Sequence, residues 1–213
     1  MLSRYNFVVV EGNTGAGKTS LAQMLASDYN ATLLLEEFED NPFLPKFYYE
    51  PHKYAFHTEI HFMLDRQQQI KRWLDDFYAH NKGLTIADYL PIKSLLYSEI
   101  NLEKDEYMLF HRLFHSLFEQ LPQPELVIYI HSTVPRLLRN IEKRGRNFEK
   151  ASRAHYLQTV ENTYFRYFRH NPQLRVIVIH ADNMDYVENP NHYGLIRQWL
   201  QQDYPIGISE VRL

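Results

Sequence analysis

One eight-residue segment constrains the fold of this 213-residue chain more than any other feature. Residues 12–19 read Gly-Asn-Thr-Gly-Ala-Gly-Lys-Thr, a full match to G-x-x-x-x-G-K-[ST], and they directly follow the apolar run FVVVE. Glycines at these spacings let backbone N–H groups turn inward around phosphate oxygens, and a helix that follows adds the positive end of its dipole. The motif therefore predicts a strand, a phosphate-binding loop and a helix in succession.

The pattern assigns a role to the individual residues of this loop. We expect Lys18 to reach the β- and γ-phosphates of a bound ATP and the Thr19 hydroxyl to ligate Mg²⁺. The residues expected to bind the nucleotide are Gly12, Asn13, Thr14, Gly15, Ala16, Gly17, Lys18 and Thr19.

Short apolar runs alternate with longer segments of helical period along the rest of the chain, which predicts an α/β fold with a parallel sheet. The apolar runs are continuous rather than alternating, as expected for strands whose two faces are both covered by helices. The five predicted strands are Phe7–Glu11, Thr32–Glu36, Leu84–Asp88, Leu126–His131 and Arg175–His180. The predicted helices are Lys18–Tyr29, Tyr54–Tyr78, Glu103–Leu121, Val134–Arg144, Arg153–His170 and Asn191–Gln201. We expect a single domain over residues 1–213, with residues of about 145–152 as a lid.

The composition of the chain excludes several kinds of site and of binding partner. The chain has no cysteine, which excludes disulfides, thiolate metal sites and cysteine nucleophiles. Its formal charge of −3 argues against a nucleic acid polymer as partner. It contains no stretch long and apolar enough to span a membrane, so we expect a cytoplasmic protein without membrane association. Residues 136–153 carry seven Lys/Arg against two Glu, which leaves −3 − 5 = −8 on the rest and predicts a site for a small anionic ligand.

Two acidic residues fall at the predicted ends of neighbouring strands. Glu36 ends the second strand and Asp88 the third, at the edge where an open α/β sheet holds its ligands. Asp88 follows Thr-Ile-Ala, the pattern of an apolar strand and then a metal-binding acid, so we expect it to hold Mg²⁺ together with Thr19. Glu36 is placed to orient an attacking hydroxyl or to accept its proton. The alternative for both is a solvated acid at a strand end.

With these residues placed, the sequence resembles the deoxynucleoside kinases, and most of all their bacterial deoxyadenosine/deoxyguanosine kinase branch. The matching stretches occur in the same order as in the family and extend over nearly the whole chain. The matching stretches are EGNTGAGKTSLA (11–22), LEEFEDNPFLPKFYYEP (35–51), YAFHTEIHFMLDRQQQI (54–70), TIADY (85–89), LVIYIH (126–131) and NIEKRGRNFEKASRAHYL (140–157).

The resemblance implies a P-loop kinase fold, a homodimer, and ATP- and Mg²⁺-dependent phosphorylation of a deoxynucleoside 5′-hydroxyl. It also implies roles for further residues. Tyr48 and Glu149 match the pair that holds the sugar 3′-hydroxyl, and Glu59 and Arg66 match the helix positions that meet the nucleobase. The residues expected to act in catalysis are Lys18, Glu36 and the lid arginines Arg144 and Arg146.

The chain departs from the family pattern at three positions. Tyr89 stands where the family has an arginine beside the metal-binding acid, Asn140 where it has a further lid arginine, and Ser94 where some relatives have an aspartate. The loss of cations near the reacting groups bears on the rate, because such charges stabilise the transition state. Two other functions therefore stay open at this point: a nucleoside-monophosphate kinase, and a non-catalytic nucleotide-binding module that acts in regulation.

The sequence also allows a prediction about the base. Glu59 and Arg66 lie seven residues apart on one predicted helix, about two turns or roughly 10.5 Å. Phe62 lies between them and would form part of an apolar floor under a flat heterocycle. A carboxylate offers only acceptors, which fits the two adjacent donors of guanine. We therefore expect purines over pyrimidines, with deoxyguanosine ahead of deoxyadenosine. The alternative is that Glu59 pairs with Arg66 and does not read the base directly.

Overall fold

A computed structural model describes residues 2–37, 40–80, 83–118, 122–146 and 154–213 of the chain. Its centre is one parallel sheet with the strand order β2-β3-β1-β4-β5-β6. The strands are β1 (Phe7–Gly12), β2 (Thr32–Leu34), β3 (Thr85–Ala87), β4 (Leu126–His131), β5 (Arg175–His180) and β6 (Gly207–Val211). The α/β class and the parallel sheet are confirmed.

The predicted number of five strands is wrong, because the segment GISEV near the carboxyl terminus forms a sixth. β6 pairs only with β5, at the edge of the sheet, and Ser209 and Glu210 take up two of its five positions. An edge strand needs no continuous apolar run, so the pattern that identified the other strands does not detect it. Two predicted strands also end early: β2 stops two residues before Glu36, and β3 stops one residue before Asp88.

The helices follow the predicted order, with two short additions. They are α1 (Lys18–Tyr29), α2 (Leu44–Tyr49), α3 (Pro51–His80), α4 (Lys93–Asn101), α5 (Lys104–Leu117), α6 (Val134–Arg144), α7 (Ala154–His170) and α8 (Pro190–Trp199), with a 3₁₀ turn at Leu2–Arg4. The sequence did not predict α2 and α4, both under ten residues long. Residues 147–153, which include most of the predicted lid and Glu149, lie outside the described residues.

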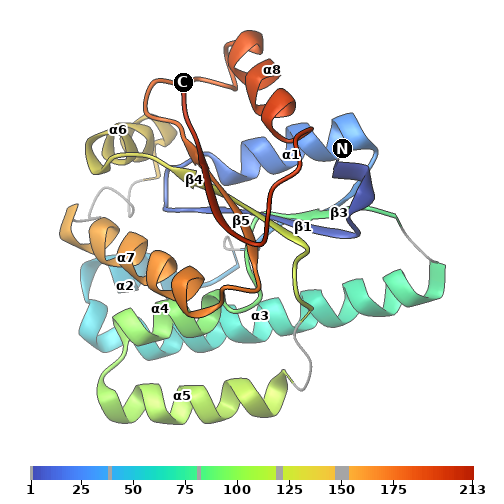
Figure 1. Ribbon diagram of the computed structural model, residues 1–213. Coiled ribbons are helices and arrows are strands. Elements are labelled where there is room, and N and C mark those ends of the chain that lie inside the picture. The colour runs from blue at the N-terminus through green and yellow to red at the C-terminus, as the bar shows by residue number, and fades with distance from the viewer. Residues whose placement is uncertain (1, 38–39, 81–82, 119–121, 147–153) are drawn as a thin grey trace.

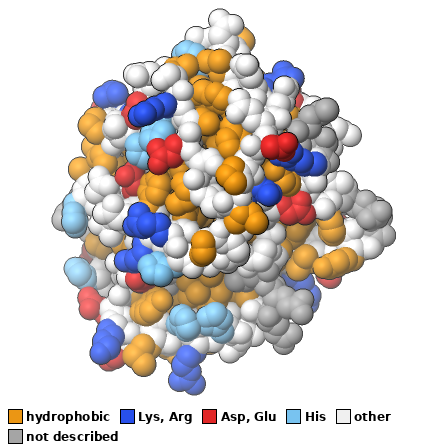
Figure 2. All heavy atoms as spheres, viewed as in Figure 1, with side chains coloured by type: hydrophobic (Ala, Val, Ile, Leu, Met, Phe, Trp, Pro, Cys, Tyr) orange, Lys and Arg blue, Asp and Glu red, His pale blue; other side chains and the backbone are white. Residues whose placement is uncertain are grey.

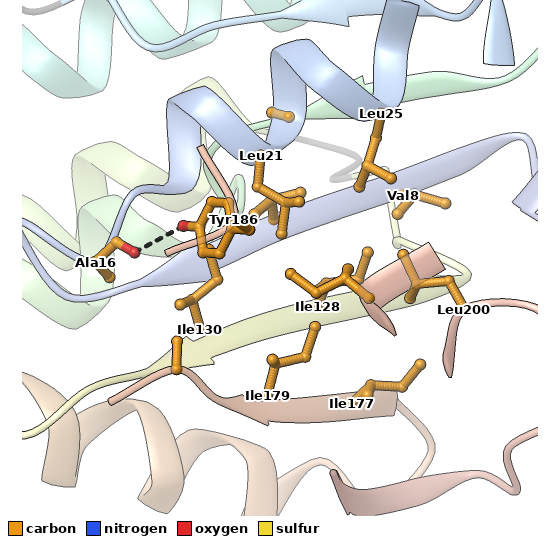
Figure 3. Packing of buried hydrophobic residues seen from close by; sticks show 14 of the residues in the cluster. Val8, Ala16, Leu21, Leu25, Ile128, Ile130, Ile177, Ile179, Tyr186 and Leu200 are labelled. Atoms are coloured by element: carbon orange, nitrogen blue, oxygen red, sulfur yellow. Dashed lines mark hydrogen bonds between the residues drawn. The ribbon is translucent and has the colours of Figure 1, made fainter. Parts of the chain in front are cut away.

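Alternate residues of the strands enter two separate layers of core. Val8 and Val10 of β1 lie in one cluster with Leu21 and Leu25 of α1, on the face covered by α1, α6 and α8. Figure 3 shows this layer, in which side chains from β1, β4 and β5 meet those of α1. Phe7 and Val9, the alternate residues of β1, lie in the second cluster, on the face covered by α3, α4 and α7. Helices on both faces explain why these strands are apolar throughout.

A third cluster fixes α3 and α5 beyond the second layer. Met63 and Ile70 of α3 pack with Phe110 and Phe114 of α5 and with Tyr89, which follows β3. The long helix α3 is thereby held beside the sheet, with Arg66 next to Glu36 beyond the end of β2 and Trp73 against Phe7 and Thr85 at the start of β1 and β3. This placement matters for function, because Glu59 and Arg66 lie on α3.

The outside of the molecule shows no large basic area on the side seen in Figure 2, where blue and red side chains are interspersed among the described residues. Within the described parts of the chain, no helix combines the length and the apolar character needed to cross a membrane.

Candidate functional site

The phosphate-binding loop lies between β1 and α1, as the motif predicts. Its glycines adopt positive φ angles, +82° at Gly15 and +93° at Gly17. A Cβ at Gly17 would collide with the hydroxyl of Tyr186, which donates a hydrogen bond to the Ala16 carbonyl (Figure 3). The loop therefore requires glycine here for two reasons, the backbone conformation and the approach of Tyr186.

Two asparagines attach this loop to the helices α6 and α7. Asn13 Nδ2 donates to the carbonyl of Leu157 on α7 at 2.7 Å, and Asn140 Nδ2 donates to the carbonyl of Gly15 at 2.8 Å. Asn140, which stands at a position where the family has an arginine, thus contacts the loop backbone directly. Arg144 and Arg146 follow on the same side, at the end of α6, and both line the cavity that the loop opens into.

The two predicted metal ligands lie in contact. Thr19 Oγ1 donates a hydrogen bond to Asp88 Oδ2 at 2.6 Å. The other oxygen of Asp88 accepts the backbone N–H of Glu36 at 2.7 Å. Burial, followed by the charge of Glu36, raises the pKa of Asp88. A hydroxyl and a carboxylate oxygen are hard ligands of the kind Mg²⁺ takes, and that ion is usually completed by substrate phosphates and water rather than by a full protein cage. The residues present therefore fit a magnesium ion.

Glu36 is held by two buried cations, one on each oxygen. Arg66 donates to Oε1 from Nε at 3.0 Å and from Nη2 at 2.5 Å. Lys93 donates to Oε2 from Nζ at 2.7 Å. Burial alone would raise the pKa of this carboxyl, but Lys93 and Arg66 outweigh it and hold the pKa of Glu36 well below its usual range. The carboxylate is therefore ionised at neutral pH.

Sequence reasoning missed Lys93. It is the first residue of α4, and its side chain is only 6% exposed. Burial works against its charge, but the carboxylates of Glu36 and Glu11 outweigh that effect and raise the pKa of Lys93. The same charge acts on Lys18, because burial and then the repulsion from Lys93 lower the pKa of Lys18 to about 8. The spacing of the sequence gives no signal for Lys93, because it reaches Glu36 only once α4 has packed against α3.

Glu11 was missed as well, although it is fully buried at the end of β1. Its Oε1 accepts the backbone N–H of Leu90 at 2.8 Å, and its Oε2 accepts that of Gly12 at 3.1 Å. Burial raises the pKa of Glu11, with Lys93 and Lys18 acting in the opposite direction. Glu11 thus connects the start of the phosphate loop to the segment after β3.

Glu59 does not form the hydrogen bond with Arg66 that the alternative interpretation requires. Its Oε1 accepts from Asn101 Nδ2 at 2.7 Å, whereas Arg66 is directed to Glu36 and to Ser94 Oγ, the latter at 2.7 Å. The second oxygen, Oε2, is buried without a hydrogen-bond partner among the described residues, and so is Thr58 Oγ1. Burial raises the pKa of Glu59 to about 7.

A single cavity of about 690 Å³ connects these groups. One end is formed by the phosphate loop with Arg144 and Arg146, and the other by side chains of α2, α3, α4 and α7. Its volume suits a drug-sized ligand or a nucleotide with a small second molecule. The residues around the second end are Leu44, Phe47, Tyr48, Thr58, Glu59, Phe62, Arg66, Tyr97, Asn101 and Tyr156. The cavity therefore brings together the predicted site residues that the structure describes, apart from Gly12 and Asn13, which do not line it.

Comparisons with known proteins identify the family of the chain. A profile of the family described as deoxynucleoside kinase matches residues 8–202. The deoxyguanosine kinase of Bacillus subtilis (strain 168) is 34% identical over 194 residues, which cover 89% of this chain and 93% of that enzyme. The deoxyadenosine kinase of Lactobacillus acidophilus is 28% identical over 194 residues, which cover 86% and 89% of the two chains.

Solved structures give the same fold. The deoxyadenosine kinase from M. mycoides with bound dATP matches this chain with a TM-score of 0.75 at 22% identity, covering 92% of this chain and 100% of the other. The same enzyme with bound dCTP matches with a TM-score of 0.75 at 20% identity. At these identities the likeness establishes the fold of the chain.

Proposed function

The chain belongs to the deoxynucleoside kinase family and is a kinase, and from this premise we propose that it transfers the γ-phosphoryl group of ATP to the 5′-hydroxyl of a purine deoxynucleoside. The observation that carries the proposal is the single cavity that joins the phosphate loop, Glu36 and the recess around Glu59. In this proposal ATP occupies the end of the cavity at the phosphate loop and the deoxynucleoside the recess around Glu59, and Glu36 lines the same cavity. Proximity of this kind is the main contribution a protein makes to phosphoryl transfer.

The mechanism follows from the contacts. Lys18 and the backbone of the phosphate loop hold the β- and γ-phosphates, and Arg144 and Arg146 compensate charge on the transferred group. Glu36 orients the 5′-hydroxyl and takes up its proton. A carboxylate of low pKa is a weak base, but the transition state of phosphoryl transfer is loose, so the 5′-hydroxyl needs little deprotonation before it attacks the γ-phosphorus and ADP leaves. Thr19 and Asp88 would hold Mg²⁺, which neutralises phosphate charge when bound.

The acceptor end of the cavity favours a nucleoside over a nucleoside monophosphate. A monophosphate acceptor requires cations that are available for its phosphate. In the described part of this recess the cations are Arg66 and Lys93, and both are paired with Glu36. Turnover of deoxynucleosides but not of their monophosphates is therefore the result that tests the proposed function.

We further propose that Glu59 selects the base. Its unpartnered Oε2 and the hydroxyl of Thr58 supply polar atoms beside the apolar ring of Phe62. An ionised Glu59 presents only acceptors and fits guanine, whereas a protonated Glu59 presents a donor and an acceptor and fits adenine. Oε1 can accept a second hydrogen bond besides that of Asn101, because a carboxylate oxygen has two lone-pair sites.

This assignment predicts a pH-dependent selectivity. Since burial raises the pKa of Glu59 to about 7, the group changes from mainly protonated to mainly ionised between pH 6 and pH 8. The ratio of kcat/KM for deoxyguanosine to that for deoxyadenosine should rise by at least about tenfold over this range. Glu59→Gln should remove the pH dependence and shift the ratio towards deoxyadenosine. A ratio that is flat with pH in the wild type and unchanged by Glu59→Gln would exclude Glu59 from base recognition.

The helix α5 supports the proposal that the protein is a homodimer. Leu109, Leu113 and Leu117 lie at i, i+4 and i+8 and are 48%, 37% and 37% exposed. Figure 1 shows α5 at the outside of the layer formed by α3 and α4. An exposed apolar stripe along an outer helix is typical of a protein–protein contact.

A further inference from the structure

The starting point is a lysine that is too deeply buried to be a surface charge. The side chain of Lys93 is buried, and its Nζ lies 2.7 Å from Glu36 Oε2 and 5.4 Å from the ring centre of Tyr97. Lysine is almost never buried without a partner of opposite charge. The cost of burying this ammonium group indicates that the site depends on its charge at this place.

The neighbouring charges define what Lys93 does. Three carboxylates lie near the carboxyl ends of β1, β2 and β3: those of Glu11 and Asp88 are buried, and that of Glu36 is partly buried. The charge of Lys93 helps to lower the pKa of Glu36, and it opposes the rise that burial causes in the pKa of Glu11 and Asp88. Lys18 of the phosphate loop interacts with the same three acids, whereas Lys93 reaches them from the acceptor side of the cavity.

Tyr89 cannot supply that charge. It occupies the position after Asp88 where the family has an arginine, and it is fully buried with its hydroxyl donating to Gln69 Oε1 at 2.9 Å. Burial raises the pKa of Tyr89 far above neutrality, so the phenol is neutral. After Tyr89 the chain turns: the N–H of Lys93 bonds to the carbonyl of Leu90 at 2.9 Å, and α4 begins. This turn brings the side chain of residue 93 back to Glu36.

We propose that Lys93 is a positioning residue for the phosphoryl transfer, which takes the place of the missing arginine by holding the Oε2 atom of Glu36 and by supplying positive charge at the acceptor end of the reaction. The inference rests on the proposed function. Arg66 alone fixes one oxygen and leaves the carboxylate free to rotate about that contact. With Lys93 on the other oxygen both are fixed, which is the geometry that a group aimed at a hydroxyl needs.

The test compares three substitutions. Lys93→Met removes the charge and the hydrogen bond, Lys93→Gln keeps a hydrogen-bond donor without the charge, and Lys93→Arg keeps both. Lys93→Met and Lys93→Gln should each lower kcat by about 10²-fold, with the KM for the deoxynucleoside changed by less than about threefold. The kcat of Lys93→Arg should be at least about tenfold higher than that of Lys93→Met. Lys104→Met, an exposed lysine at the start of α5, is the matched control and should leave kcat unchanged.

A double-mutant cycle separates positioning from a structural role. In a Glu36→Gln background, Lys93→Met should lower kcat by a further factor of less than about three. The reason is that the carboxylate through which Lys93 acts is gone. Equal losses in both backgrounds, or a kcat within about threefold of wild type for Lys93→Met, would overturn the proposal. If Lys93→Met does not fold, as judged by circular dichroism, Lys93→Gln is the deciding variant by the same criteria. Absence of turnover by the wild type would instead contradict the proposed function itself.

Discussion

Glu36→Gln should lose about 10²- to 10⁴-fold in kcat while deoxynucleoside binding changes by only a few-fold. The amide is nearly isosteric with the carboxylate, but it cannot take up the proton of the 5′-hydroxyl. It also has a single acceptor atom, so it cannot satisfy both Arg66 and Lys93, which contact different oxygens of Glu36. Calorimetric titration of the deoxynucleoside, beside steady-state kinetics, measures the two effects separately.

Glu36→Asp is the matched control for this substitution. It keeps the charge and both acceptor atoms but withdraws the carboxylate by one methylene, so its kcat should fall between those of the wild type and of Glu36→Gln. Near-wild-type turnover by Glu36→Gln would exclude Glu36 as the group that accepts the proton. Equal losses for the two variants would assign the effect to distance and not to proton uptake.

Lys18→Ala should abolish transfer, with a loss of at least about 10³-fold in kcat/KM. Its Nζ lies 3.1 Å from the carbonyl of Asn13 within the loop, where it can reach a bound γ-phosphate. Removing it leaves the phosphates without the one side-chain cation that the loop itself contributes. Steady-state kinetics with ATP measures the loss, and Lys71→Ala, on the exposed side of α3, is the control. A Lys18→Ala enzyme that retained a tenth of wild-type activity would contradict the assignment.

The sequence predicts those parts of the fold that depend on local pattern. The limits of α1 and α6 are predicted to the residue, because each has an apolar stripe and a clear end, as at Gly145, which caps α6 with a φ of +76°. β6 and α4 escape detection because neither is long or continuously apolar. β6 forms because it pairs with β5, and α4 forms because it packs against α3.

In the candidate site, too, the residues that belong to a local motif were predicted and those brought together by packing were not. Thr19 was expected at the metal from the loop motif and Asp88 from its place after an apolar strand, and Thr19 Oγ1 lies 2.6 Å from Asp88 Oδ2. The partners of Glu36 could not be read from spacing, because Arg66 and Lys93 reach it from two helices that only the packing of α3 against α4 brings together. Asn101 is a similar case, since it meets Glu59 across 42 residues of sequence.

The most direct test of the account follows the phosphoryl group itself. The wild-type enzyme is incubated with γ-labelled ATP, Mg²⁺ and, separately, each of the four deoxynucleosides and their 5′-monophosphates, and the position of the label is determined. The account predicts label on the 5′-oxygen of deoxyguanosine first and deoxyadenosine second, in amounts equal to the ADP formed. Label found only in nucleoside diphosphates, or only in inorganic phosphate, would contradict it.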